Sequence, residues 1–404
     1  MGKIKSYTSI KNKFWYPLIV TLLIITIPGF LSTFDFATSH RNGVLISLFL
    51  IFLFMLKSLI YVNKKFINIS IIFVIIISIT TLINICLINY QPDTFKTSMI
   101  RFLGSILILS LVILSAIFFE NYLDTLDDHH FKKLISSIYN FLIFLGFVAF
   151  PFYYFDLLWK KHLFFFSEPS HYSISLAPFF FYKIFVSKIK FIHITSLILL
   201  GLMWGSFTLL VVSLSGVLLV YNLRKNILVN FLIIIILIIS VLYLKEKFQF
   251  VSDRLYFSTD TNNLSLLSFF SGYERAYLSF FESYGIGMGL QQMGVIGPLG
   301  EIQEKIRLII GDYMNIYDGS SLAPKIIFEF GITGIFVILI YLYYFGKNLI
   351  KLRSNSLKSE KELFFSLVFI SLIIILFGRS ASYFTPSMFI FTVGLVGINK
   401  TRKY

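Results

Sequence analysis

Residues 68–89 read NISIIFVIIISITTLINICLIN, an apolar segment without a single charged side chain. A helix rises about 1.5 Å per residue, so a helix of this length crosses the roughly 30 Å hydrocarbon layer of a bilayer. The strands of a membrane barrel are shorter and alternate between apolar and polar residues. The stretch therefore predicts a membrane-spanning α-helix.

The composition of the whole chain agrees with this segment. Of the 404 residues, 57% are hydrophobic and only 14% are charged, which is unlike a soluble domain. The sequence therefore predicts an all-α fold, a polytopic bundle of membrane helices in which residues 1–404 form a single domain. The only cysteine, Cys86, lies in an apolar segment, and we expect it to be a small core residue without a disulfide.

Twelve segments of the chain are candidate spans. Gly201, Gly205 and Ser206 interrupt residues 192–221, which favours two short helices over a single long one. The predicted spans are 14–32, 43–61, 68–89, 98–119, 134–155, 171–187, 192–205, 207–221, 227–244, 325–345, 364–378 and 382–397.

The excess of cations predicts the topology. Lys and Arg number 35 against 20 Asp and Glu, a balance that we assign to cytoplasmic loops and not to nucleic acid, because membrane insertion retains cations on that side. With twelve spans and both termini cytoplasmic, most of the cationic loops fall inside. The largest outer segment is then the loop of residues 245–324, between spans 9 and 10, which could form an extramembrane subdomain.

Three charged residues fall within or beside predicted spans, all toward the outer leaflet: Arg101, Glu329 and Arg379. Charges at this depth are costly and often functional. The alternative is that both arginines reach lipid headgroups while Glu329 pairs with Lys325, four residues earlier on the helix.

The motif SEPSH, residues 167–171, precedes the sixth span on the outer face. Pro169 fits the first turn of a helix with Ser167 as its N-cap, so Glu168 and His171 could face one cavity. A carboxylate beside aromatic side chains, or one held ionised by an arginine, suits acid or base catalysis. The alternative is a helix cap followed by an interfacial histidine.

The large loop carries Arg275 ten residues before a run of alternating glycines, Gly285, Gly287 and Gly289. Such glycines allow close backbone approach to a ligand, or they serve only a tight turn. Their spacing is not that of a dinucleotide-binding motif, and the chain has no phosphate-binding loop of the nucleotide-hydrolase type. No cluster of metal-ligating residues stands out, so we expect no metal and no cofactor.

Five motifs, taken in order, resemble the Wzy-type O-antigen polymerases, within the superfamily of membrane glycosyltransferases that also contains the O-antigen ligases. The resemblance covers the whole chain in topology, and the order of the motifs carries more weight than any one of them. The motifs are SEPSHYSISLAPFFFY (167–182), LLVVSLSGVLLV (209–220), YERAYLSFFESYGIGMGL (273–290), SSLAPKIIFEFGITGI (320–335) and GRSASYFTPSMFIFTVGLVG (378–397).

The resemblance implies an enzyme of the bacterial inner membrane that polymerises undecaprenyl-diphosphate-linked oligosaccharide repeats at the periplasmic face, without a metal or nucleotide. The growing chain would pass to the non-reducing end of a new lipid-linked repeat. Its substrates would be a lipid-linked donor and acceptor, its surroundings membrane lipids, and its candidate partners a chain-length regulator and a flippase. Nucleic acid is not expected.

The loop arginine of the family maps onto Arg275, and Arg254 matches less securely. For the implied reaction we assign Arg275 first, then Arg101 and Arg379, to the diphosphates, because a guanidinium binds phosphate oxygens and stays charged. Glu168 is the candidate base or acceptor orienter, with His171 second and Asp318 third.

The alternatives are an O-antigen ligase, a lipid-linked oligosaccharide flippase or a non-catalytic scaffold. The ligase pattern has a His-Asn pair where this chain reads DGSSLAP, residues 318–324, and a flippase should show two related halves.

Overall fold

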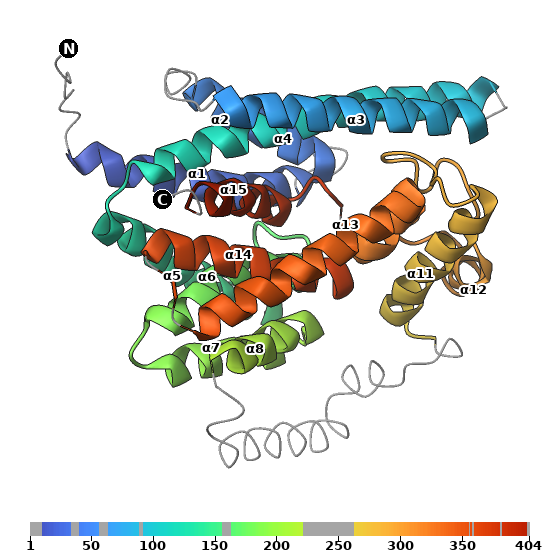
Figure 1. The fold of residues 1–404 in the computed structure, drawn as a ribbon. Helices are drawn as coiled ribbons and strands as arrows, with labels where there is room; N and C mark the ends of the chain where they lie inside the picture. Colours follow the sequence, from blue (N-terminus) through green and yellow to red (C-terminus); the bar gives the residue numbers. More distant parts are fainter. Residues whose placement is uncertain are drawn as a thin grey trace.

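A computed structural model describes residues 10–33, 40–55, 64–88, 92–155, 163–220, 262–354, 356–357, 359–379 and 382–401. Every regular element in these ranges is a helix (Figure 1). The all-α prediction is therefore confirmed for the described part of the chain. The predicted span 227–244 lies outside these residues.

The helices follow the apolar segments of the sequence closely. The predicted break within 192–221 is confirmed, because α7 and α8 are separate helices on either side of residues 204–206. The elements are α1 (Ile10–Thr33), α2 (His40–Met55), α3 (Lys64–Ile88), α4 (Pro92–Asp124), α5 (Asp128–Tyr154), α6 (Pro169–Val186), α7 (Lys190–Met203), α8 (Phe207–Val220), α11 (Leu264–Glu282), α12 (Glu301–Ile310), α13 (Leu322–Arg353), α14 (Glu360–Phe377) and α15 (Pro386–Thr401).

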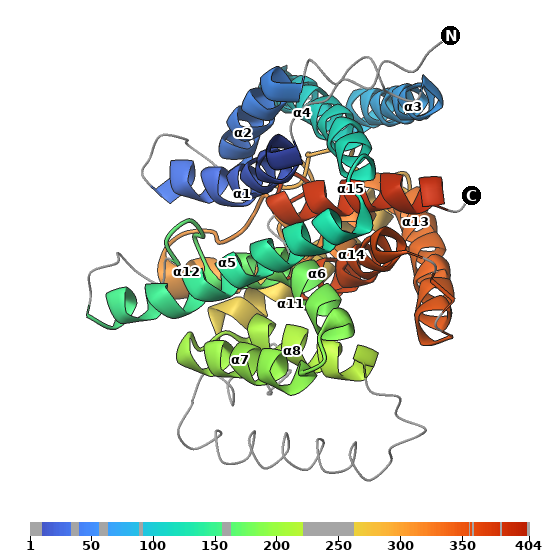
Figure 2. The same cartoon turned by 90° about the vertical axis from the view of Figure 1, so that its left-hand side faces the viewer.

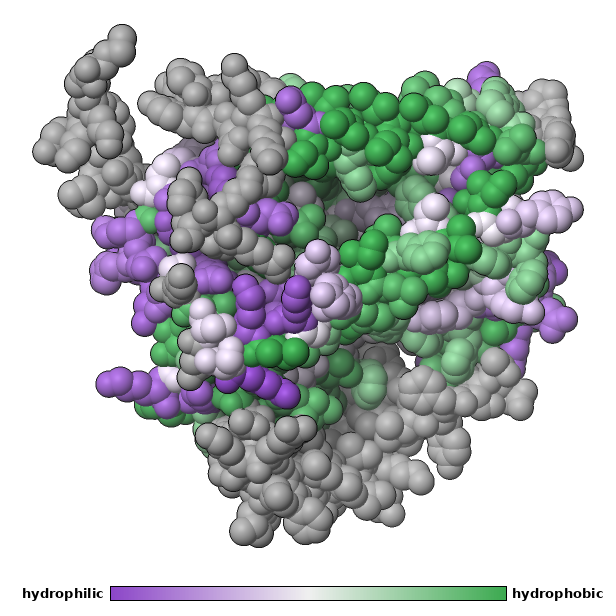
Figure 3. Space-filling model, viewed as in Figure 1, coloured by the Kyte–Doolittle hydropathy of each residue, from purple (hydrophilic) through white to green (hydrophobic). Residues whose placement is uncertain are grey.

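Among the described helices, four are long and apolar enough to cross a membrane: those of Ile67–Ile88, Asp93–Asp124, Asp128–Tyr154 and Leu322–Arg353. Hydrophobic residues cover α3 and α13 in Figure 3, whereas hydrophilic residues gather on the left-hand side of that view. These helices indicate a membrane-embedded protein. Cys86 is exposed on α3, so its prediction as a core residue was wrong; the small side chain lies on the outer surface of a sparsely packed helix.

The centre of the bundle is α6, which packs against α5, α8 and α14. Its residues Phe179, Phe180 and Phe181 are all fully buried. Figure 2 shows α1 and α2 on one side of the bundle and α7 and α8 on the other, with α5, α6, α14 and α15 between them. The core thus holds the N-terminus of α6, where the SEPSH motif lies, in a fixed position.

Ion pairs join the helices at one end of the bundle. They connect Lys361 to Asp124, Lys132 to Glu360, and Lys400 to Glu120. At this end α4 and α15 terminate, whereas α5 and α14 begin. The opposite end therefore contains the start of α4, the end of α14 and the start of α15.

Candidate functional site

The N-terminus of α6 lies at the end of the bundle opposite these ion pairs, because the Tyr182 hydroxyl near the C-terminus of α6 donates to Glu360 over 2.7 Å. Pro169 occupies the first turn, as predicted. The N-cap residue is Glu168 and not Ser167, which corrects the predicted cap. The Ser167 hydroxyl instead contacts Nδ1 of His171 at 2.9 Å, because the extended backbone of Glu168 already starts the helix.

Glu168 forms an ion pair with Arg379, which directly follows the residue that caps α14. Nη2 of Arg379 lies 3.1 Å from Oε2 of Glu168, and the Ser170 hydroxyl donates to the same oxygen over 2.8 Å. Burial alone would raise the pKa of Glu168, but Arg379, His171 and Ser170 together hold this pKa below its usual value. Glu168 is therefore an ionised carboxylate at neutral pH.

A cavity of about 720 Å³ opens beside this ion pair. Its wall includes hydroxyl groups and aromatic rings from α6, α8, α11 and the end of α14, a mixture that suits a polar ligand with some apolar surface. The lining residues are Ser167, Glu168, Pro169, Ser170, Trp204, Gly205, Ser206, Phe207, Thr208, Ser265, Leu266, Phe269, Met314, Ser320, Phe377, Gly378 and Arg379.

Lys325 organises a second group of charges. Its side chain is only 2% exposed, and Nζ donates to the Tyr317 carbonyl over 2.6 Å and lies 3.6 Å from Oδ1 of Asp318. Burial raises the pKa of Asp318, and the attraction of Lys325 and Arg379 offsets this rise only in part. Arg379 therefore acts electrostatically on both Glu168 and Asp318, although Asp318 is not among the residues that line the cavity.

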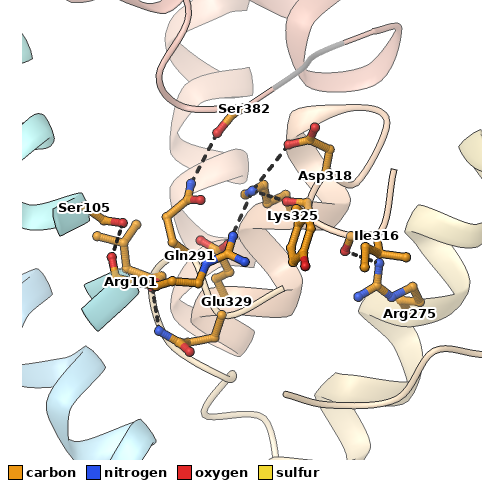
Figure 4. Close-up of polar contacts among 12 residues, drawn as sticks. Arg101, Ser105, Arg275, Gln291, Ile316, Asp318, Lys325, Glu329 and Ser382 are labelled. Carbon is orange, nitrogen blue, oxygen red and sulfur yellow. Dashed lines mark hydrogen bonds and ion pairs between the residues drawn. The ribbon is translucent and has the colours of Figure 1, made fainter. Parts of the chain in front are cut away.

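The same lysine also contacts Glu329, which is fully buried. Nζ of Lys325 lies 3.8 Å from Oε1 of Glu329, so the predicted pairing of these two residues is confirmed. The guanidinium of Arg101, from α4, lies 4.4 Å from the centre of the Tyr317 ring and is electrostatically coupled to Glu329 and Asp318. Figure 4 shows Arg101 of α4 and Asp318 of the turn before α13 beside Lys325 and Glu329 of α13.

Arg275 has a different environment. Its side chain is 1% exposed, its Nη1 donates to the Ile316 carbonyl over 2.6 Å, and its Nε donates to the Pro298 carbonyl over 3.3 Å. Burial lowers its pKa to about 10, so it stays charged at neutral pH. Arg275 thus braces the segment that carries Asp318, and it is not among the residues that line the cavity.

The glycine run lies against the backbone of α13. The amides of Met288 and Gly289 donate to the carbonyls of Phe328 and Glu329 over 3.0 and 2.8 Å, and the Ile332 amide donates to Gly285 over 2.8 Å. These bonds form at a break in α13, where Gly331 has φ 55° and ψ −129°. The glycines therefore let this loop approach the backbone of α13 closely, beside the buried Glu329. The partner in this close approach is the protein itself.

The three glycines all have a positive φ. Gly285, Gly287 and Gly289 have φ values of 79°, 90° and 100°, which favour glycine.

Arg254, the less secure of the predicted arginines, lies outside the described residues.

Sequence reasoning noted Lys325 only as a partner of Glu329 and missed its contact with the turn at Asp318. A lysine and a glutamate four residues apart in an otherwise apolar helix were the available signal.

No protein-family model, curated protein or solved structure matches this chain.

Proposed function

We propose that the protein is a polysaccharide polymerase of the bacterial inner membrane, with about twelve spanning helices and the loop of residues 245–324 on the periplasmic side. It joins undecaprenyl-diphosphate-linked oligosaccharide repeats, transferring the growing chain to a new lipid-linked repeat. The proposal starts from the resemblance of the five motifs to O-antigen polymerases. Nothing in it depends on a metal or a nucleotide.

The observation that carries the proposal is the Glu168–Arg379 ion pair on the wall of a cavity of about 720 Å³. Transfer of a sugar from a diphosphate requires a cation for the leaving group and a base for the acceptor hydroxyl. A guanidinium binds phosphate oxygens through a planar fork and stays charged. Arg379 and Glu168 supply these two groups side by side.

The proposed reaction is a single displacement. The acceptor hydroxyl oxygen attacks the anomeric carbon of the donor while the bond from that carbon to the diphosphate oxygen breaks, and the electron pair leaves with the diphosphate. Glu168 takes the hydroxyl proton. When the diphosphate engages Arg379, Glu168 loses part of its ion pair, so its pKa rises from its lowered value and the carboxylate becomes a better base.

The distribution of charge supports the assignment of sides. Lys132, Lys361 and Lys400 lie at one end of the bundle, and the Glu168–Arg379 pair lies at the other. Cations concentrate on the cytoplasmic side of membrane proteins. The cavity would therefore open toward the periplasm, where lipid-linked repeats are joined.

Replacing the proposed base tests the function. In a strain that lacks the native gene, Glu168→Gln should leave the protein in the membrane but reduce the surface polysaccharide from a ladder of lengths to single repeats, seen on a polysaccharide gel. Asp312→Asn is the matched control, because Asp312 is an exposed acid that is not among the cavity-lining residues, and it should keep the ladder.

Other outcomes of this experiment would overturn the proposal. A normal ladder from Glu168→Gln would remove Glu168 from the mechanism. In a deletion strain, repeats trapped in the cytoplasm would indicate a flippase, and lipid A-core without even one repeat would indicate a ligase.

A further inference from the structure

One side of α11 carries aromatic rings that no described part of the protein covers. Tyr277, Phe281 and Tyr284 are 64%, 62% and 94% exposed. Their spacing of four and then three residues places them along one face of the helix and its C-terminal turn. The opposite face is buried, with Arg275 and Ser279 almost fully enclosed. The exposed rings are therefore a continuous stripe and not scattered surface residues.

Tyr284 takes an unfavourable backbone conformation to hold its ring outward. Its φ of 52° lies in the left-handed region, where helices usually end with glycine. A non-glycine residue in this region is strained. The chain therefore places a large, 94% exposed ring at a position that favours glycine.

Hydrogen bonds join the residues that directly follow this stripe to two apolar helices. The Gly285 carbonyl accepts from the Ile332 amide of α13 over 2.8 Å, and the Ile286 carbonyl accepts from Nδ2 of Asn84 of α3 over 3.5 Å. Beside these bonds, Ile332 is 51% exposed and Ile83 is 50% exposed. The aromatic stripe thus continues the exposed apolar surfaces of α3 and α13, both long enough to span a bilayer.

The residue types fit one partner, the headgroup layer of a lipid membrane. Tyrosine and phenylalanine present a large apolar ring, and the tyrosine hydroxyl can reach water, a combination that favours the membrane–water interface. Exposed Glu282 beside Phe281 limits the depth of insertion, because a carboxylate is costly in hydrocarbon. We propose that the Tyr277–Phe281–Tyr284 stripe of α11 lies in the lipid headgroup layer, at the level where α3 and α13 leave the hydrocarbon. The proposal does not depend on the reaction in the cavity.

Site-directed spin labelling tests this placement in the full-length protein. Cys86, the only cysteine, lies near the C-terminal end of α3 at the level of the stripe, so it is first replaced by serine, and Ile76→Cys, at the middle of α3 and 54% exposed, reports the lipid-facing surface. In a Cys86→Ser background, Tyr284→Cys tests the stripe, and Glu301→Cys, exposed at the start of α12, gives the aqueous reference. Each labelled protein is reconstituted into vesicles of phosphatidylethanolamine and phosphatidylglycerol, and its accessibility to oxygen and to a water-soluble nickel chelate is measured.

The expected result is a ratio of oxygen to nickel accessibility at position 284 that is several-fold above the ratio at position 301 and below the ratio at position 76. Equal ratios at 284 and 301 would overturn the proposal, because the stripe would then face water. Dipolar broadening between labels at position 284 that disappears on dilution with unlabelled protein would also overturn it, because the stripe would then contact a second copy of the chain. Phe281→Cys provides a second position if Tyr284→Cys fails to fold.

Discussion

The smallest feature that links the structure to chemistry is the pair of carboxylates Glu168 and Asp318. Their pKa values shift in opposite directions: Arg379, His171 and Ser170 lower that of Glu168, whereas burial raises that of Asp318. Groups whose environments separate their pKa values are candidates for different proton-transfer roles. From the sequence alone, Glu168 could not be distinguished from a residue that only caps a helix.

The Glu168–Arg379 pair makes the stability of the protein depend on pH. Because the pKa of Glu168 is lowered by folding, the pair contributes stability above the unfolded glutamate pKa of about 4.3, and the contribution is lost as the pH falls through the lowered value. Glu168→Gln should lower the free energy of unfolding at neutral pH by about 0.2–1 kcal/mol, since the Glu168 side chain is 46% exposed and the pair is screened.

This dependence is measured as the unfolding midpoint of both proteins against pH in one detergent. The difference between them should shrink in acid. A difference that grows in acid would mean that folding raises the pKa of Glu168.

At the scale of elements, the break in α13 depends on glycine at both contacting segments. A Cβ added at Gly287 would lie 2.6 Å from the carbonyl oxygen of Glu329, and a Cβ at Gly331 would lie 2.0 Å from that of Gly285. Both contacts are with backbone, which cannot rotate away. The glycine run and the break therefore form one joint, in which neither segment can change alone.

Gly287→Ala should lower the free energy of unfolding by more than about 1 kcal/mol, because the new methyl group adds this clash to an unfavourable φ of 90°. Gly346→Ala, in α13, is the control, since a Cβ at that position meets nothing within 4 Å. The control should be neutral or stabilising, as expected for alanine in a helix. Thermal unfolding in one detergent compares them, and equal midpoints would contradict the proposed role of the joint.

The elements also show what the sequence could and could not predict. Hydrophobic length and glycine interruptions were enough to locate α3, α4, α13 and the separation of α7 from α8, because these signals are local. The break at Gly331 was not predicted, since a glycine in an apolar helix is common and the partner loop is distant in sequence. The contact between Lys325 and Asp318 was not predicted either, because it forms through a turn that has no hydrophobic pattern.

At the scale of the whole molecule, the ion pairs and the cavity define two ends. With the cationic end in the cytoplasm, Asp312 and Ser354 should lie on opposite sides of the membrane, since Asp312 precedes α13 and Ser354 caps its C-terminus. In a Cys86→Ser background, Asp312→Cys should react with a membrane-impermeant maleimide in intact spheroplasts, whereas Ser354→Cys should react only after lysis. The reverse pattern would invert the assignment of sides.

The sparse packing of α3 affects how the sequence of this helix can vary. Besides its contact with α4, α3 meets the loop of residues 286–290 through polar side chains: the Thr81 hydroxyl accepts from the Leu290 amide over 3.2 Å, and Asn84 donates to Ile286. Most of the remaining surface of α3 faces outward, so one aliphatic side chain can replace another there at little cost. The polar positions Thr81 and Asn84 and the buried Ile85 should therefore tolerate fewer substitutions than the outward-facing isoleucines, which can be exchanged for other aliphatic residues without altering the site.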